Sequence, residues 1–328
     1  NAALVRGLQK QAELTGVVKV EFIGAVSKGL EGKELAEMGD MAEAGVVAFS
    51  DDGHYVENAA FMRRALEYSS MFNKMVIDHA EDITLTKNGH MHEGIVSYEL
   101  GVIGRPAVAE DLAVARDILL SEMTGGHIHI AHVSSKNTVD MVRRAKAKGL
   151  NVTCEVTSQH LSFTDEYLRE YNPAFKMAPP IRSEDHRQAL LEGLKDGTID
   201  AIITDHAPHA YEEKDHEFCC APNGFSGLET SLAAVITNAY GPDKLSIDQV
   251  VYYMSTRPAE LMHLDAGVLE VGKPADITVF STTEKWTVDR NKFYTKGKVS
   301  PFDGMTVTGK AKLTVVDGKI VMKEGVVL

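Results

Sequence analysis

The sequence predicts an α/β fold, a TIM-type (β/α)8 barrel, with a small β-rich module near the C-terminus. Short runs rich in Val, Ile and Ala alternate with helical patterns over most of the chain, and this alternation is typical of a parallel sheet. Apolar runs of this kind are typical of parallel strands buried on both faces. After about residue 260 the pattern changes to β-rich segments with turn signals. We therefore expect a barrel over residues 1–260 and a small β module over residues 261–328.

Six segments have the composition of buried strands. In chain order they cover residues 17–26, 46–50, 75–78, 127–132, 150–156 and 200–204. A closed barrel of this type needs eight parallel strands. We therefore expect the first two strands to lie before residue 1, so that the barrel is incomplete at its N-terminal side in this chain.

Segments with helical periodicity separate these strands. They cover residues 34–45, 57–72, 107–123, 137–149 and 183–197. Pro106 stands just before one of them, where proline is tolerated, and Ser183 is placed to cap another. In the C-terminal part, residues 267–281 and 311–328 are the β-rich segments, and Asp317–Gly318 is a turn signal.

Composition argues against several classes of protein. The formal net charge is −13 and no basic stripe is present, so a nucleic-acid partner is not expected. No run of 18 apolar residues occurs, so no membrane span is expected. The cysteines are Cys154, which lies mid-strand and reads as core, and the adjacent pair Cys219 and Cys220. This pattern gives no disulfide framework, and a cytoplasmic location is the simplest expectation.

Acidic and histidine residues stand at the ends of four predicted strands. Asp52 follows the second strand, His79 the third, His132 the fourth and Asp205 the sixth. In a β/α barrel, the carboxyl ends of the strands form the face that carries the chemistry. Carboxylate and imidazole ligands that converge there can bind one or two Zn²⁺ ions and activate water. The pattern predicts a metal-dependent hydrolase.

Some neighbouring polar residues have a plainer interpretation. We expect Asp51 to be a loop residue that hydrogen-bonds nearby, and His206 to point away from the site because strands alternate faces. By the same parity, His127 and His129 are expected to pack or hydrogen-bond rather than to bind metal. His160 follows a strand end and is a candidate to orient a ligand.

Longer stretches of the chain carry a family resemblance. They are FSDDG, DHAED, AHVSS, CEVTSQHLSFTD, FKMAPPIR, GLKDGTIDAIITDHAPH, APNGFSGLETSL, GVLEVGKPADITVF and SPFDGM. In this order the chain resembles class I dihydroorotases of the amidohydrolase superfamily, from about residue 17 to the end. TDHAPH and APNGFSGLET are the most specific pair. The His-x-His motif and the following arginine that open the family's barrel are absent, so the resemblance implies that they precede Asn1.

The resemblance implies a role for each strand-end residue. Asp52 stands where this class has a carboxylate that bridges two zinc ions. His79 and His132 would bind the second, more exposed zinc ion. Asp205 would bind the first zinc ion and act as general acid and base.

The resemblance also implies substrate-binding residues. His209, Asn223 and Gly224 would hold the substrate. From its composition we also expect the loop 210–224 to close over the substrate, because its acidic stretch YEEKDHE is typical of a solvated flexible segment. The substrate-binding position 178 departs from the family. Relatives usually have asparagine there, and Ala178 would lose one hydrogen bond to the substrate.

The implied activity is that of a zinc-dependent dihydroorotase, which interconverts N-carbamoyl-L-aspartate and L-dihydroorotate in pyrimidine biosynthesis. Two alternatives stay open. One is an allantoinase or hydantoinase, which Ala178 favours. The other is a catalytically silent dihydroorotase-like partner of a transcarbamoylase. The expected partner is a small-molecule substrate, with no nucleic acid and no membrane, and a homodimer is expected because symmetric dimers are common.

Overall fold

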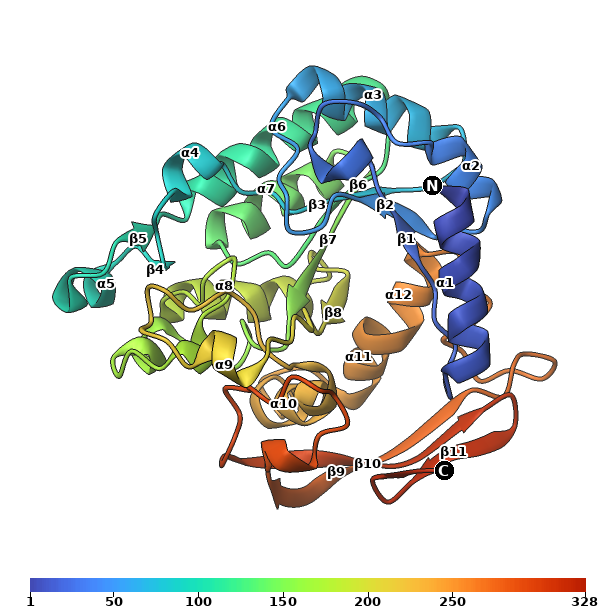
Figure 1. Ribbon diagram of the computed structural model, residues 1–328, viewed down its shortest axis with the longest axis vertical. Helices are drawn as coiled ribbons and strands as arrows, with labels where there is room; N and C mark the ends of the chain where they lie inside the picture. Colours follow the sequence, from blue (N-terminus) through green and yellow to red (C-terminus); the bar gives the residue numbers. More distant parts are fainter.

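Six short parallel strands form one curled sheet in the computed structural model, which describes residues 1–328 (Figure 1). Their order in the sheet is β1-β2-β3-β6-β7-β8, and every neighbouring pair is parallel. The strands are β1 (Ile23–Gly24), β2 (Ala48–Ser50), β3 (Val76–Asp78), β6 (Ile128–Ile130), β7 (Val152–Thr157) and β8 (Ala201–Ile203). The six predicted strands are confirmed. The first is much shorter than predicted, because it lies at the edge of the sheet and pairs with β2 alone.

The predicted helices cover one side of this sheet, and consecutive helices contact each other (Figure 1). They are α2 (Met38–Glu43), α3 (Ala59–Ser70), α6 (Val108–Thr124), α7 (Lys136–Ala147) and α8 (Glu184–Lys195). Ser183 occupies the N-cap position of α8, but its side chain makes no capping hydrogen bond. Its hydroxyl donates instead to Asp185 Oδ1 at 2.5 Å, so a nearby carboxylate replaces the expected backbone partner.

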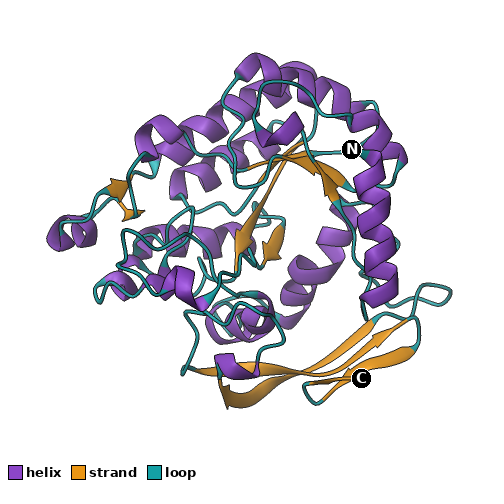
Figure 2. Ribbon diagram, viewed as in Figure 1, coloured by secondary structure: helices purple, strands orange, loops and turns teal.

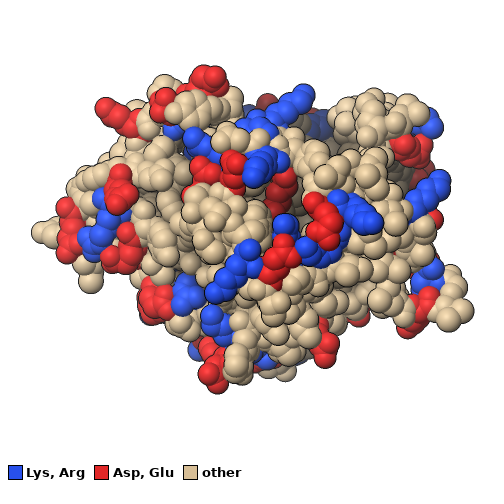
Figure 3. Space-filling model, turned by 90° about the horizontal axis from the view of Figure 1, so that it is seen from below, with Lys and Arg blue, Asp and Glu red and all other residues tan.

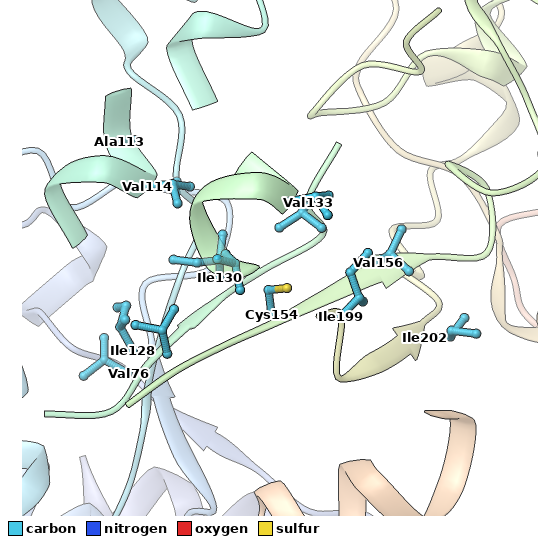
Figure 4. Close-up of a cluster of buried hydrophobic side chains, with 14 of the residues drawn as sticks. Val76, Ala113, Val114, Ile128, Ile130, Val133, Cys154, Val156, Ile199 and Ile202 are labelled. Carbon is cyan, nitrogen blue, oxygen red and sulfur yellow. The ribbon is translucent and has the colours of Figure 1, made fainter. Parts of the chain in front are cut away.

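The main core fills the space between the parallel sheet and these helices. Figure 4 shows Ile128, Ile130 and Cys154 from the strands beside Val114 from α6. Each is buried, and Cys154 is fully so, as its mid-strand position predicts. Close packing of aliphatic side chains on both faces of a short strand holds that strand in a fixed position and orientation. The core therefore positions the residues that follow each strand.

A separate antiparallel sheet occupies the C-terminal part of the chain (Figure 2). It consists of β9 (Ile277–Thr287), β10 (Thr306–Val316), β11 (Lys319–Lys323) and β12 (Val326–Val327), in the order β12-β11-β10-β9. Asp317 and Gly318 form the tight turn between β10 and β11 with φ of 48° and 77°, as their sequence predicts. The predicted division of the chain at residue 260 stays a prediction.

The structure contains further elements besides the predicted strands and helices described above. The segment between β3 and α6 contains a two-stranded ladder and two short helices: α4 (Ile83–Thr86), β4 (Met91–His92), α5 (Ile95–Leu100) and β5 (Gly104–Arg105). The other α-helices are α1 (Ala2–Thr15), α9 (Tyr211–Lys214), α10 (Ser231–Asn238), α11 (Ile247–Val251) and α12 (Arg257–Leu261). Short 3₁₀ or π turns are η1 (Lys28–Leu30), η2 (Asp165–Leu168), η3 (Pro173–Phe175), η4 (Leu228–Thr230), η5 (Tyr252–Thr256) and η6 (Arg290–Lys292).

The surface carries charges of both signs. On the face shown in Figure 3, Lys and Arg side chains alternate with Asp and Glu, and no basic stripe is visible. None of the helices has the length and apolar character needed to cross a membrane.

Candidate active site

The carboxyl ends of the parallel strands open into a pocket of about 320 Å³. Seven of the eight predicted site residues line it: Asp52, His79, His132, Ala178, Asp205, Asn223 and Gly224. They come from loops that follow four different strands and from two longer connections. The rest of the lining consists of Gly53, Tyr55, Glu81, Ile83, Arg105 and Ala207.

His79 and His132 are in direct contact at one wall of this pocket. The Nδ1 atom of His79 lies 2.7 Å from the Nε2 atom of His132. Their rings meet edge to face, with centroids 4.4 Å apart and planes at 82°. They follow β3 and β6, which pair in register from Val76↔Ile128 to Asp78↔Ile130. Pairing of two strands that are distant in sequence therefore brings the two imidazoles together.

Backbone conformation sets His132 and Asp205 apart from ordinary strand residues. Their φ angles are +33° and +41°, in the left-handed region that non-glycine residues seldom adopt. Each follows the last residues of a strand, where the chain turns sharply away from the sheet. Such strain tends to gather at functional sites, because the surrounding structure has to hold it. Both side chains line the pocket as a result.

Burial shifts the protonation of two of these residues. It lowers the pKa of the His79 imidazole well below 6.5, and His132 and Arg105 nearby lower the pKa further. Burial raises the pKa of the Asp205 carboxyl above 3.8, although His132 opposes the shift. His79 is thus neutral near pH 7, with a lone pair available to a metal ion.

The donor atoms suit a zinc ion in kind. Neutral imidazoles and carboxylates are zinc ligands, and the pocket lining contains two histidines and the carboxylates of Asp52 and Asp205. Only His79 and His132 are in contact, and no group of three or more His, Cys, Asp or Glu side chains is gathered closely enough to hold a metal ion. The chemistry of the donor atoms therefore fits a zinc ion.

The segment that ends in Asn223 and Gly224 forms another wall. His209 lies behind this wall rather than among the lining residues, and its Nε2 atom contacts the carbonyl oxygen of Asn223 at 2.7 Å. Gly224 has a φ of +107°, and a Cβ atom there would lie 2.7 Å from the carbonyl oxygen of Ala207. Only glycine allows the backbone to approach so closely. His209 therefore contacts the segment of Asn223 and Gly224 and does not line the pocket.

The acidic stretch 211–217 was predicted to be solvated, and this is wrong for Lys214. Its side chain is buried, and its Nζ atom donates to the carbonyl oxygens of Pro222 at 2.8 Å and Lys176 at 3.3 Å. Lys176 is also buried, and its Nζ atom donates to the carbonyl oxygens of Cys219 and Ala221 at 3.0 and 2.7 Å. The two lysine side chains thus hold the loop in place, because they donate hydrogen bonds to its carbonyl oxygens, which would otherwise be buried without a partner.

The polar residues that we expected to lie outside the site have hydrogen-bond partners that agree with this expectation. Asp51 is buried and accepts hydrogen bonds from the backbone of Val26 and Ser27 at 2.9 and 2.8 Å. His206 accepts from the backbone N–H groups of Gly227 and Leu228, both at 3.3 Å. Neither residue lines the pocket.

The other histidines also have partners outside the pocket. His127 Nε2 and His129 Nδ1 contact Thr153 Oγ1 at 2.7 and 2.8 Å. His160 contacts Thr157 Oγ1 and the carbonyl oxygen of Pro179, at 2.8 and 3.2 Å. His160 therefore fixes the segment next to Ala178 rather than a predicted ligand.

Two charged lining residues escaped sequence reasoning. Glu81 lies two residues after His79, and Arg105 belongs to β5. The guanidinium Nη2 atom of Arg105 donates to Glu81 Oε2. Only the position of Glu81 within DHAED gave a signal, whereas nothing in the sequence around Arg105 indicates that β5 brings it to the pocket.

Comparisons with known proteins agree with this arrangement. The model of the amidohydrolase family matches residues 18–321. A dihydroorotase of Acetivibrio thermocellus is 46% identical over 328 residues, which are all of this chain and 77% of the relative. A dihydroorotase of Pelotomaculum thermopropionicum is 48% identical over 318 residues, or 97% of this chain and 74% of the relative.

Similarity to solved structures extends to the whole chain. An L-hydantoinase of Arthrobacter aurescens has a TM-score of 0.89 and 28% identity, and the match covers 100% of this chain and 75% of that one. A dihydropyrimidinase of Brevibacillus agri has a TM-score of 0.82 at 23% identity, covers 98% and 74% of the two chains, and so shows the fold alone. Sequence identity is much higher to the dihydroorotases than to the hydantoinase. The chain belongs to the amidohydrolase family, and within it to the dihydroorotases.

Proposed function

We propose that the protein is a zinc-dependent dihydroorotase that reversibly hydrolyses L-dihydroorotate to N-carbamoyl-L-aspartate in pyrimidine biosynthesis. The observation that carries the proposal is the convergence of Asp52, His79, His132 and Asp205 on one pocket. Identity of 46% over the whole chain to a protein named dihydroorotase supports the choice of substrate.

The proposed metal ligands are Asp52, His79, His132 and Asp205. Zinc bound by such residues lowers the pKa of water and polarises a carbonyl oxygen. His79 is suited to this role because burial lowers its pKa, so that its nitrogen need not lose a proton first. Burial around Asp205 limits the water that competes for its carboxylate.

Asp205 is the proposed general acid and base. In hydrolysis a C–O bond forms between water and the ring carbonyl carbon, and the ring C–N bond breaks. Asp205 accepts the proton that the attacking water loses and passes it to the departing ring nitrogen. Burial raises the pKa of the Asp205 carboxyl, so its carboxylate accepts a proton more readily than that of an exposed aspartate.

The proposed substrate-binding wall consists of Ala178, Asn223 and Gly224, with His209 behind it. Asn223 and Gly224 line the pocket, and two buried lysines hold their segment. Rigid placement of such groups lowers the entropy lost when substrate binds.

Turnover of L-dihydroorotate by the full-length, zinc-loaded protein is the direct test, with hydantoin and allantoin assayed in parallel. We expect dihydroorotate alone to be hydrolysed. Preference for hydantoin would favour the hydantoinase alternative, which Ala178 and the similarity to L-hydantoinase support. Absence of turnover with zinc bound would favour the silent partner of a transcarbamoylase.

A further inference from the structure

The turn between β6 and α7 determines where the imidazole of His132 lies. His132 has a φ of +33°, in the strained left-handed region. Its imidazole takes part in one hydrogen bond, between Nε2 and Nδ1 of His79. A metal-binding histidine usually has a partner on its other ring nitrogen, and that partner fixes the orientation of the ring. In His132 the backbone of the turn has to supply this constraint.

Glu110, in the first turn of α6, binds the middle of this turn. Its Oε1 atom accepts hydrogen bonds from the backbone N–H groups of Ser134 at 3.0 Å and Ser135 at 2.9 Å. Its Oε2 atom accepts from the hydroxyl group of Ser134. Ser135 is the N-cap residue of α7, so the carboxylate lies at the N-terminus of a helix, where the helix dipole favours a negative charge.

Other elements hold the two sides of the turn. The backbone N–H of Val133 donates to the carbonyl oxygen of Glu155 on β7 at 2.8 Å. The backbone N–H of Lys136 donates to Nδ1 of His186 on α8 at 3.0 Å. The two N–H groups between these bind only the carboxylate of Glu110. The middle of the turn therefore depends on one side chain from a distant part of the chain.

Arg182 keeps the carboxylate of Glu110 ionised. The side chains are 1% and 3% exposed, respectively, and Nη2 of Arg182 lies 3.4 Å from Oε2 of Glu110. Burial alone would raise the pKa of Glu110, but Arg182 and the hydrogen bonds from Ser134 and Ser135 outweigh it and hold the pKa below 4.5. The carboxylate is therefore charged at neutral pH although it is fully enclosed.

The same ion pair connects the turn to two other segments of the pocket wall. Arg182 lies four residues after Ala178, and its Nη1 atom donates to the carbonyl oxygen of Arg105 at 3.3 Å. Ala178 and Arg105 both line the pocket. A buried ion pair adds little net stability compared with apolar side chains of the same volume. The position that it gives to the turn explains its presence here better than stability does.

We propose that Glu110 is a positioning residue for His132. Its carboxylate holds the turn after β6 and so sets the direction in which the imidazole presents its nitrogen to a metal ion. The inference rests on the proposed function, because it concerns the proposed ligand His132. Glu110 does not line the pocket. It acts through the backbone of Ser134 and Ser135, whose hydrogen bonds keep the strained turn from relaxing.

The test measures metal binding by the full-length protein, with Co²⁺ as the probe. Metal-free parent and Glu110→Gln are titrated with Co²⁺, and the visible absorption spectrum of the bound ion reports the geometry of its ligands. Glutamine has nearly the shape of glutamate but lacks the charge and one of the two accepting oxygens. We expect Glu110→Gln to bind Co²⁺ about 10- to 100-fold more weakly than the parent, with a changed spectrum.

Asp200→Asn is the matched control. Asp200 is also a buried carboxylate, with a side chain that is 5% exposed and ion pairs to Lys146 and Arg257. It accepts a hydrogen bond from the backbone N–H of Cys154 at 3.0 Å, and it does not line the pocket. We expect Asp200→Asn to lower the free energy of unfolding in urea but to keep the Co²⁺ affinity and spectrum of the parent.

A folded Glu110→Gln with the affinity and spectrum of the parent would overturn the proposal. The same loss of affinity in Asp200→Asn would also overturn it, because a general loss of order would then explain both variants. If Glu110→Gln does not fold, Ser134→Ala replaces it, since this change removes one hydroxyl and leaves the pair of Glu110 and Arg182 in place. We expect a smaller loss of affinity in Ser134→Ala, again with a changed spectrum, and no change in either would count against the proposal.

Failure of the proposed function gives a different result. A parent that binds Co²⁺ but does not turn over L-dihydroorotate would refute the proposed function and leave the role of Glu110 intact. A parent that binds no Co²⁺ would overturn both.

Discussion

His79 Nδ1 and His132 Nε2 lie 2.7 Å apart, although 53 residues separate them in the chain. The contact exists because β3 and β6 are neighbours in the parallel sheet and end at the same level. Both rings sit at the pocket wall, and the pKa of His79 is lowered by burial and by its neighbour. An imidazole nitrogen that carries no proton has a lone pair, which a bound metal ion would accept.

Replacement of His132 by alanine should abolish activity and leave the fold in place. The side chain is a proposed ligand, and the substitution removes no large apolar group from the core. We expect kcat/KM to fall at least about 1000-fold and bound zinc, measured by atomic absorption, to decrease. His216→Ala, at an exposed site on the loop, is the control. Full activity in His132→Ala would rule out the ligand assignment.

Asp205→Asn should slow the chemical step much more than it weakens substrate binding. Asparagine keeps the shape of the side chain but cannot take up the proton of the attacking water. We expect kcat to fall about 10²- to 10⁴-fold, while the dissociation constant for dihydroorotate changes much less. Rapid-mixing kinetics and calorimetry measure the two quantities. A variant that keeps most of its kcat would show that another group transfers the proton.

Lys214→Met should loosen the loop that ends in Asn223 and Gly224. Lys214 donates to the carbonyl oxygens of Pro222 and Lys176, and methionine cannot. We expect KM for dihydroorotate to rise about tenfold and limited proteolysis within residues 209–224 to become faster. The exposed Lys148→Met provides a control. Unchanged KM and unchanged cleavage would mean that the loop is held by other contacts.

Stability should fall as pH decreases from 6.5 toward 4, in part through His160. Burial lowers the pKa of His160 from 6.5 to about 4. In this interval the unfolded state binds a proton at His160 and the folded state does not, so the free energy of unfolding decreases as pH falls. His160 alone should contribute roughly 2 kcal/mol of this decrease between pH 7 and pH 5.

Urea unfolding of the parent and of His160→Gln at the two pH values measures this contribution. We expect the decrease between pH 7 and pH 5 to be smaller in the variant by about that amount. An identical pH dependence in both proteins would show that His160 titrates normally in the folded state. Comparison within each protein removes the constant cost of the substitution itself.

Local sequence alone identified the parallel strands and the residues at their ends. The runs that become β2, β3 and β6 are short and rich in apolar residues, as is expected of strands buried on both faces. Asp52, His79 and His132 lie within two residues of the strand ends, so they converge on one edge of the sheet because the strands are parallel. The hairpin at Asp317–Gly318 was predictable for a similar reason, since its conformation is set within two residues.

Tertiary structure alone decided which other side chains reach the pocket. Arg105 lines it because the ladder of β4 and β5 folds back beside Glu81, and no local pattern marks that path. Lys214 is buried within an acidic stretch because distant carbonyl oxygens need a donor. Ion pairs and hydrogen bonds to backbone carbonyl oxygens connect residues that are far apart in the chain. The periodicity of a sequence, by contrast, indicates only which face of a single strand or helix is buried.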